Sequence, residues 1–370
     1  MRLLLALAAT VLAAGSACAE LRSGMSAGGV DWSIERSGAD GRIHLEISRR
    51  TGNSHWSIGR TIPASMLQGL SEAQLAGDGG PARFAIVRDA GRLDCEGVVR
   101  RGRGTGECGF VPDPGFAAAL RERGIGTPSP DEAFSMTVND VGLAFVDELR
   151  RQRYATPSVA ELAQAGGHGV TFQYLQGMGA QGYRVGSLGA LIGMRDHGVT
   201  PEFVAALAAY GISDLSADEV VRLRDHGVSA EFVGEMRELG YARLPVESLV
   251  RLRDHGVSAE FVRTLARHGI GGVRADELVR LRDHGVSAEF VGALRTHGFG
   301  RLGTDEIVRL RDHGVTGEYL GELRALGYSD LSAEEIVRLR THGVTGDFIR
   351  RANSAGRRSA EELVRLRIGG

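Results

Sequence analysis

Histidine recurs at a fixed interval in this sequence, and imidazole can bind metal ions or change its charge near neutral pH. The tripeptide His-Gly-Val occurs every 29 residues, beginning at His168, His197, His226, His255, His284, His313 and His342. One histidine per repeat would place neighbouring imidazoles on the order of 10 Å apart, which is too far for two of them to share one ion. Each histidine is also expected at a helix C-terminus, where the helix dipole favours a partly cationic side chain. We therefore interpret this histidine series as structural and expect no metal site and no cofactor, with acid-dependent stability as the remaining hypothesis.

Arginine and aspartate precede most of these histidines, as Arg222, Arg224 and Asp225 do in one repeat. Such arginines can bind an anionic polymer, but Asp218 and Arg222 are spaced to pair within one helix, and Arg222 can also reach Asp225. The chain carries 44 basic and 46 acidic residues, which argues against a general nucleic-acid-binding protein because that role needs a basic face. We expect a solvated or inter-repeat ionic face. The absence of lysine is attributed to genome composition in preference to a need for bidentate arginine contacts.

One short match to a catalytic motif occurs near the N-terminus. Gly24, Met25, Ser26, Ala27 and Gly28 fit the pattern GxSxG, which marks a nucleophilic serine only at a strand-to-helix turn beside an oxyanion hole. These residues precede every predicted strand, and the sequence contains no HExxH, phosphate-loop or dinucleotide-binding motif. We expect no catalytic residue and no enzymatic activity.

The first residues have the pattern of a secretory signal peptide. A positive charge and an apolar run from Leu3 to Ala14 are followed by small residues as far as Ala19. We expect residues 1–19 to be removed, which places the mature protein in the periplasm or outside the cell. No later segment has the ~18 apolar residues that a membrane span needs. A lipid on Cys18 is the minor alternative, since the residues before it lack the aliphatic residue typical of lipoprotein signals.

Residues 20–112 have apolar residues with a period of two, which is typical of β-strands. From Ile43 to Ile47 apolar residues alternate with polar ones, and from Trp56 to Arg60 the alternation continues. Gly- and Asp-rich turns separate further apolar segments. We predict a small antiparallel β domain of about six strands.

Two cysteines remain after removal of the signal peptide, and an oxidising compartment favours a disulfide between Cys95 and Cys108. A two-residue turn at Arg101 and Gly102 would place the cysteines opposite each other in a hairpin. Counted from that turn they form a non-hydrogen-bonded pair, where the strands approach most closely and a cross-strand disulfide is allowed. We predict this bond, with a register slip at the Gly-rich turn as the alternative.

Each 29-residue repeat reads as two short helices with specified ends, as residues 215–241 illustrate. Ser216 and Glu219 form a capping box at the start of the first helix. Gly227, directly after a histidine, supplies the left-handed residue that ends it. Helices of about ten residues are marginal alone and are stabilised by stacking on the next repeat. The residues predicted to end first helices in five repeats are His197, Gly198, His226, Gly227, His255, Gly256, His284, Gly285, His313 and Gly314.

The same spacing extends beyond the histidine series. We predict nine second-type helices, which follow the His-Gly-Val turn or its equivalent, with caps from residue 113 to residue 345. Nine first-type helices, which precede that turn, are predicted to start near residues 129 to 359, and degenerate units at both ends are expected of caps. The predicted fold class is α+β and multidomain: a small antiparallel β domain (20–112) followed by an all-α helical-hairpin solenoid (113–370).

Outward positions of the second-type helices vary between repeats, whereas the first-type helices are nearly constant. A repeat protein keeps its core pattern and places specificity at exposed variable positions, although drift on a solvated face gives the same variation. We take these positions as a candidate binding face for a protein or peptide. They are Glu235, Arg237, Glu238, Arg263, Thr264, Arg267, Arg295, Thr296, Glu322 and Arg324.

The repeats resemble the form LVxLRxHGVTPEFVRELxxLGY of bacterial envelope and secreted proteins, including extensions of membrane metallopeptidases of the β-lactam-sensor type. The segment from Arg195 to Val204, RDHGVTPEFV, carries this resemblance most clearly. The peptidase itself is missing, since the sequence has neither a zinc motif nor a membrane span. The resemblance implies an envelope repeat protein without that activity.

These observations predict an exported, non-catalytic scaffold that binds a protein or peptide partner through the solenoid surface. The alternative is an envelope sensor or regulatory protein in which ligand binding at the β domain is relayed through the repeats. A hydrolase is the least supported interpretation. We expect no nucleic-acid partner and no membrane span.

Overall fold

The computed structural model of the chain describes residues 29–37, 41–51 and 54–369. The predicted signal peptide, Cys18 and the GxSxG match from Gly24 to Gly28 lie outside these residues. Within them, no helix combines the length and the apolar composition of a membrane-spanning helix. The chain divides into two compact units, the first ending at Asp196 and the second beginning at His197.

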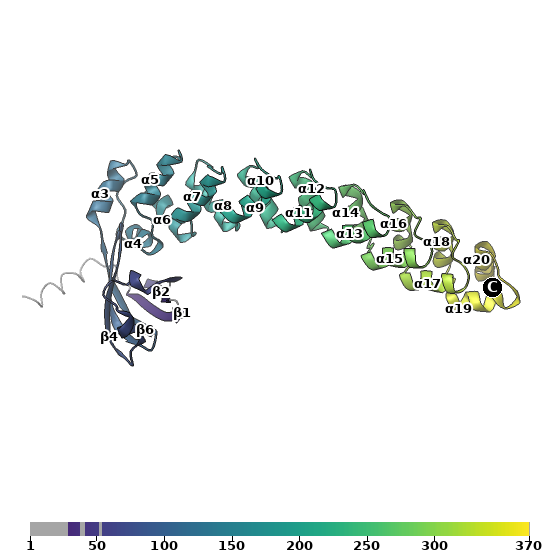
Figure 1. Cartoon of the computed structure of the whole chain (residues 1–370), viewed down its shortest axis with the longest axis horizontal. Helices are drawn as coiled ribbons and strands as arrows, with labels where there is room; N and C mark the ends of the chain where they lie inside the picture. Colours follow the sequence, from purple (N-terminus) through teal and green to yellow (C-terminus); the bar gives the residue numbers. More distant parts are fainter. Residues whose placement is uncertain (1–28, 38–40, 52–53, 370) are drawn as a thin grey trace, which may run out of the picture. The chain divides into compact units, whose positions relative to one another are not determined.

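The first unit contains a six-stranded antiparallel sheet in the order β3-β2-β1-β6-β5-β4 (Figure 1). Its strands are β1 (Val30–Ser37), β2 (Arg42–Thr51), β3 (Ser54–Pro63), β4 (Gly80–Arg88), β5 (Gly91–Arg100) and β6 (Arg103–Pro112). The 3-10 helix η1 (Ala64–Met66) and helix α2 (Glu72–Ala76) lie between β3 and β4. Pairing between β1 and β6 joins the group β3-β2-β1 to the group β6-β5-β4. The predicted antiparallel domain of about six strands is confirmed.

Successive side chains of a strand point to opposite faces of the sheet, so every second side chain is directed into the core. Trp32 of β1 is 2% exposed, and its ring packs edge-on against Phe84 with the centroids 4.9 Å apart. A methyl group added at Gly97, Gly104 or Gly106 would come within 3.0 Å of the Trp32 side chain. Because these positions of β5 and β6 lack side chains, the indole can lie directly against the strand backbone.

The last hairpin of the sheet contains the disulfide. Cys95 lies opposite Cys108 in the register of β5 and β6, and their sulfur atoms are bonded. The Cα atoms are 4.0 Å apart. Arg101 and Gly102 have φ angles of 50° and 80°, the positive values that a two-residue hairpin turn of type I′ requires. The predicted register and disulfide are confirmed.

Helices of the two types alternate after the sheet. The second-type helices are α3 (Pro114–Glu122), α5 (Leu143–Arg151), α7 (Phe172–Ala180), α9 (Pro201–Ala209), α11 (Ala230–Glu238), α13 (Ala259–Arg267), α15 (Ala288–Thr296), α17 (Gly317–Ala325) and α19 (Gly346–Ala352), which is followed by the 3-10 helix η2 (Asn353–Ala355). The first-type helices are α4 (Pro130–Asn139), α6 (Val159–Gly167), α8 (Leu188–Asp196), α10 (Ala217–Asp225), α12 (Val246–Asp254), α14 (Ala275–Asp283), α16 (Thr304–Asp312), α18 (Ala333–Thr341) and α20 (Ala360–Gly369). Within the described residues, each helix begins directly after its predicted cap, so the predicted alternation is confirmed.

Helix α10 shows how these ends are specified. The Ser216 hydroxyl accepts a hydrogen bond from the Glu219 backbone N–H at 3.2 Å, and the Glu219 carboxylate accepts one from the Ser216 N–H at 2.8 Å. At the other end Gly227 has a φ of 66°. The Val228 N–H then donates to the Leu223 carbonyl at 2.9 Å, and both side chains are buried. These contacts define a capping box and a Schellman ending.

Helix α4 packs against the sheet within the first unit. Phe134 is 6% exposed in the core of the sheet, with its ring centroid 5.9 Å from Trp56 and 5.4 Å from Phe110. The change from strand to helix falls at the predicted boundary, since β6 ends at Pro112 and α3 begins at Pro114. The compact unit nevertheless extends further, because α4 fills part of the sheet's core.

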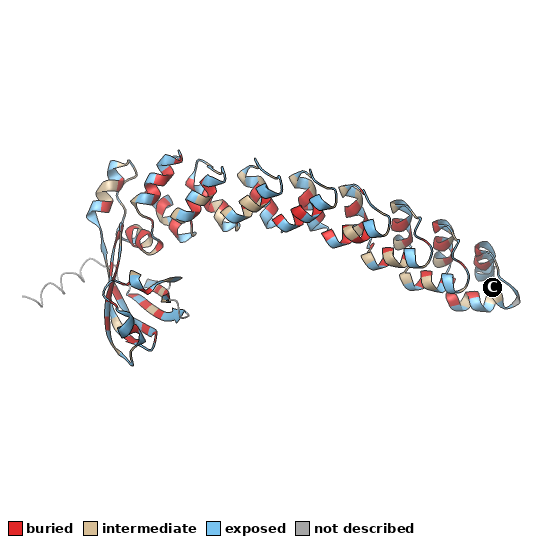
Figure 2. Ribbon diagram, viewed as in Figure 1, coloured by how far each residue is buried: buried red, intermediate tan, exposed pale blue. Residues whose placement is uncertain are grey.

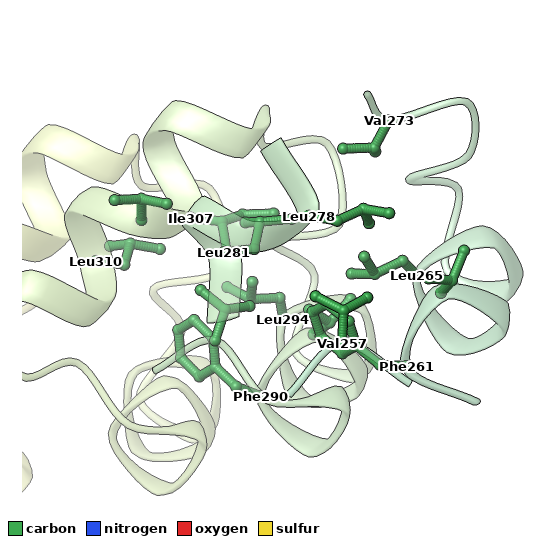
Figure 3. Close-up of a cluster of buried hydrophobic side chains, with 14 of the residues drawn as sticks. Val257, Phe261, Leu265, Val273, Leu278, Leu281, Phe290, Leu294, Ile307 and Leu310 are labelled. Carbon is green, nitrogen blue, oxygen red and sulfur yellow. The ribbon is translucent and has the colours of Figure 1, made fainter. Parts of the chain in front are cut away.

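In the second unit, helices of one type contact the same type in the next repeat, as α10 contacts α12 and α15 contacts α17. Figure 2 shows a buried and an exposed side on these helices. Leu281, Leu310 and Phe290, from different helices, belong to one cluster of buried side chains (Figure 3). The cluster extends from Leu207 to Val364. No hairpin of this unit therefore has a core of its own, as expected for stacked repeats.

Candidate functional site

The histidine series pairs with aspartates of the next repeat. His197 Nδ1 lies 2.8 Å from Asp225 Oδ1. Where Thr341 replaces the aspartate, His313 Nδ1 lies 3.4 Å from the threonine hydroxyl instead. The histidines are also the C-terminal capping residues of first-type helices, as at His226. The other pairs are His168–Asp196 in the first unit, and His226–Asp254, His255–Asp283 and His284–Asp312 in the second.

A hydrogen-bonded aspartate can orient a catalytic histidine. The surroundings of these His–Asp pairs therefore indicate whether the pairs are catalytic or structural. The histidine side chains are 38% to 49% exposed. Within the described part of the chain, their side-chain hydrogen bonds join them to aspartate or threonine and not to serine or cysteine, and the pair recurs with nearly the same distance in successive repeats. Exposed pairs of this kind contribute about 0–1 kcal/mol each. This arrangement favours a link between repeats over a catalytic centre.

The second arginine of each Arg-Leu-Arg-Asp-His motif packs on the preceding repeat. The guanidinium carbon of Arg253 lies 5.1 Å from the ring centroid of Phe232, and its Nε donates to the Gly227 carbonyl at 3.1 Å. Lysine would reproduce this contact only in part, because its ammonium has no planar face and no fixed set of donors. At these positions the geometry favours arginine over lysine. The stacking recurs as Arg195 on Tyr174 in the first unit, and as Arg224 on Phe203, Arg282 on Phe261, Arg311 on Phe290 and Arg340 on Tyr319 in the second.

The first arginine of the motif pairs between repeats and not within its own helix. Arg222 Nη2 lies 2.7 Å from Glu247 in the next repeat, and not beside Asp218 or Asp225 of its own helix. Asp225 is already paired with His197. The pairing within one helix was therefore wrong, because stacking brings an acid of the next helix closer. Both partners are about half exposed, so the pair adds little stability.

Two members of the candidate binding face are not freely exposed. Thr264 is only 9% exposed, so including it in an exposed face was wrong. Glu260 and Arg267, one turn before and one turn after it, form an ion pair of 2.5 Å, and both bond to the Thr264 hydroxyl. Arg263 is partly buried and pairs with Glu260 at 2.7 Å and with Glu235 at 3.4 Å. The exposed members are Glu235, Arg237, Glu238, Arg267, Arg295, Thr296, Glu322 and Arg324.

Some exposed members of this face also hold repeats together. Arg295 Nη1 donates to the His268 carbonyl at 3.0 Å, and Arg324 donates to the Thr296 carbonyl. These carbonyls end the preceding second-type helix, so the arginines satisfy groups that the helix itself leaves without partners. A different row of equivalent residues varies in chemistry. Within the described part of the chain, no side chain of this row is hydrogen-bonded or ion-paired to another repeat, and Arg267 bonds only within its own helix. This variable row consists of Glu238, Arg267, Thr296 and Ala325, all exposed.

A polar cluster that was not predicted lies where α4 meets the sheet in the first unit. Arg60 Nη2 donates to Asn139 Oδ1 at 2.8 Å, and the Asn139 amide donates to the Ser135 carbonyl at 2.9 Å. Arg88 Nε lies 2.8 Å from Asp140 Oδ1. Burial lowers the pKa of Arg60; the nearby Asp140 opposes this shift and Arg88 adds to it. The guanidinium remains charged at neutral pH.

The sequence did contain a signal for this cluster. Arg60 is in phase with Trp56 and Ile58 along β3, and it lies opposite the buried Leu45 of β2. A charged residue at a core-facing position of an alternating strand is unusual, because burying a charge is costly without compensation. The position of Arg60 in this alternating strand therefore indicated a polar site within the β domain.

Among the described residues, no group of three or more His, Cys, Asp or Glu side chains is arranged to hold a metal ion. Comparisons with protein-family models, with curated proteins and with solved structures found no match to this chain. The function is therefore inferred from the geometry of the chain itself.

Proposed function

We propose that the chain is an exported, non-catalytic scaffold that binds a protein or peptide partner along the exposed side of its second-type helices. The supporting observation is a contrast between the two helix types in the second unit. Repeated polar residues at the ends of first-type helices, such as Asp225 and Arg253, are bonded to the neighbouring repeat. The second-type helices keep the variable row exposed.

The variable row offers a partner a changing series of chemical groups. Glu238 is negative, Arg267 positive, Thr296 neutral and polar, and Ala325 apolar. Neighbouring groups lie one repeat apart, on the order of 10 Å. A partner that lies along the row and carries complementary groups at that spacing would be distinguished from others chiefly by electrostatic matching.

Export is part of the same proposal. The disulfide between Cys95 and Cys108 is typical of oxidising compartments, and the first residues have the pattern of a signal peptide. A periplasmic or extracellular location agrees with both. The resemblance to envelope repeat proteins supports the same location.

Site-specific photocrosslinking tests the scaffold proposal. A photoreactive amino acid would replace Glu238, Arg267 or Thr296 in the full chain, with Asp218 and Glu334, exposed on first-type helices, as matched controls. We expect the same partner to be crosslinked from at least two positions of the variable row and from neither control. Equal crosslinking from both helix types, or none from the variable row, would contradict the proposal.

A second candidate function, a sensor or regulator, is supported by the contact between α4 and the sheet. Besides Phe134 in the core, Asp131 of α4 pairs with Arg49 at 2.8 Å, and Asp89 accepts a hydrogen bond from the Leu143 N–H at 2.8 Å. A ligand at the sheet can therefore act on the first hairpins. Hydrogen exchange in α5 to α8 should then change when a ligand binds the sheet, and unchanged exchange there would exclude the relay.

A further inference from the structure

A cavity of about 130 Å³ lies between the sheet and α4 in the first unit. Its floor consists of the buried side chains of Leu45, Ile47, Ile86 and Leu93. An apolar cavity of about 150 Å³ in another protein is large enough for a benzene ring. The floor of this cavity therefore suits a small hydrocarbon group.

Both edge strands of the sheet line this cavity. Strand β3 contributes Arg60 between two isoleucines, and β4 contributes Ile86 and Arg88. Helix α4 supplies Thr137 and Val138. Two charged side chains from opposite edges of the sheet thus meet over one apolar floor, and both are only partly exposed.

Positive charge exceeds negative charge at the rim. Arg88 is paired with Asp140 at 2.8 Å. The guanidinium of Arg60 donates, within the described part of the chain, one hydrogen bond, to the neutral oxygen of Asn139. The Asn139 amide nitrogen is bonded to the Ser135 carbonyl, which keeps the amide oxygen directed at Arg60. The cavity lining therefore carries two guanidinium groups and one carboxylate, that of Asp140, which is paired with Arg88.

We propose that this cavity binds a small aliphatic carboxylate of about four to six carbons, with its chain on the apolar floor and its carboxylate on Arg60 and Arg88. The planar guanidinium matches a carboxylate with two parallel hydrogen bonds. An inorganic anion would leave the apolar floor empty, and an amine would meet two like charges. Burial of Arg60, which lowers its pKa, makes a compensating anion more favourable. This site is independent of the partner-binding role of the second-type helices.

Inward-facing charges on edge strands also prevent edge-to-edge association of sheets. That role alone requires neither a cavity beside the charges nor an excess of positive charge at its rim. The two explanations make different predictions for ligand binding, so a titration separates them.

The test is a calorimetric titration of the full-length protein with acetate, butanoate, hexanoate and hexylamine. Each buried methylene group contributes about 0.8 kcal/mol, or roughly fourfold in affinity. We expect hexanoate to bind at a single site at least about tenfold more tightly than acetate, and hexylamine not to bind. Hexanoate binding no tighter than acetate, or equal binding of hexylamine, would overturn the proposal.

Three variants assign the binding to this cavity. Arg60→Gln should weaken hexanoate binding by about tenfold or more, since a charge-assisted hydrogen bond is lost. Arg83→Gln on the same sheet, where the side chain is 85% exposed, is the charge-matched control and should bind as the parent does. Val138→Phe fills the cavity without changing its charges and should abolish binding. If Arg60→Gln fails to fold, Val138→Phe and the chain-length series still decide, and undiminished binding by Val138→Phe would refute the site.

Discussion

The contacts that stabilise the sheet of the first unit differ in sequence separation from those that stabilise the helical repeats of the second unit. In the sheet, Val30 of β1 lies opposite Cys108 of β6, and the Trp32 indole N–H donates to the Glu96 carbonyl, 64 residues away. In the repeats, the polar links described above join residues 25 to 28 positions apart, as from Arg222 to Glu247 and from His226 to Asp254. The sheet therefore depends on closing one set of distant contacts, whereas the repeats depend on many equivalent short ones.

The chain carries separate optical probes for the sheet and the helices. Both tryptophans, Trp32 and Trp56, belong to the sheet. All seven tyrosines lie at or after Tyr154, beyond the sheet. Tryptophan fluorescence thus reports on the sheet, and tyrosine absorbance reports on the helices.

The largest expected effect is the loss of a buried aromatic ring from the sheet. Phe84→Ala should lower the free energy of unfolding reported by tryptophan fluorescence by about 3–5 kcal/mol, because Phe84 is 4% exposed and packs on Trp32. Phe290→Ala in α15 removes a ring that is 5% exposed. That change should leave the tryptophan transition unaltered and increase amide hydrogen exchange only in α15 and the helices beside it.

Two results from these variants would contradict the contrast between a cooperative sheet and locally unfolding repeats. Faster exchange throughout the second unit in Phe290→Ala would show that the repeats unfold as one cooperative body. A sheet that lost only local protection in Phe84→Ala would show the reverse for the sheet.

Removal of the disulfide should have the next largest effect. The bond joins cysteines 13 residues apart, and closing a loop of about that length stabilises a fold by about 3 kcal/mol through the entropy of the unfolded chain. Denaturant unfolding of a variant with both Cys95→Ser and Cys108→Ser should show this loss in tryptophan fluorescence. The tyrosine signal should be unchanged; an equal shift in both signals would contradict a purely local role.

Alkaline pH should destabilise the helices through a buried tyrosine. Burial raises the pKa of Tyr174 to about 12, although the nearby Arg195 opposes the shift. Because the folded-state pKa is raised, the stabilising contribution is complete below the unfolded value of about 10 and is lost as the pH rises to about 12. This loss is on the order of 2 kcal/mol. Tyr174→Phe should remove that part of the pH dependence in denaturant titrations at pH 9 and pH 12, and an unchanged slope would contradict the assignment.

The smallest predicted effect distinguishes two arginines of α12. Arg253→Lys should destabilise the second unit by about 1 kcal/mol, since it removes the stacking on Phe232 and the bond to the Gly227 carbonyl. Arg251→Lys is the matched control, because Arg251 forms an exposed pair with Asp276 that lysine can also form. Hydrogen exchange of α11 and α12 would measure both. Equal effects of the two changes would show that charge alone links the repeats.

Local features of the chain were decided by the sequence. The starts of the helices follow from residues such as Ser216 and Glu219, whose side chains bond to backbone groups only three residues away. The opposition of Cys95 and Cys108 follows from a two-residue turn and the fixed period of a strand. Each of these features depends on neighbours along the chain or on a regular count, so it can be read without knowing the tertiary structure.

Only the tertiary structure determined which side chains of different helices and strands contact one another. Arg222 had two acids within reach in its own helix, yet it pairs with Glu247, because the stacking of repeats determines which acid lies nearest. Thr264 occupies an outward-looking position and is nevertheless buried beneath two long side chains. Arg60 and Arg88 are 28 residues apart in sequence and reach one cavity only because the two edges of the sheet converge there. Distances between elements depend on packing, and residue spacing within an element does not specify them.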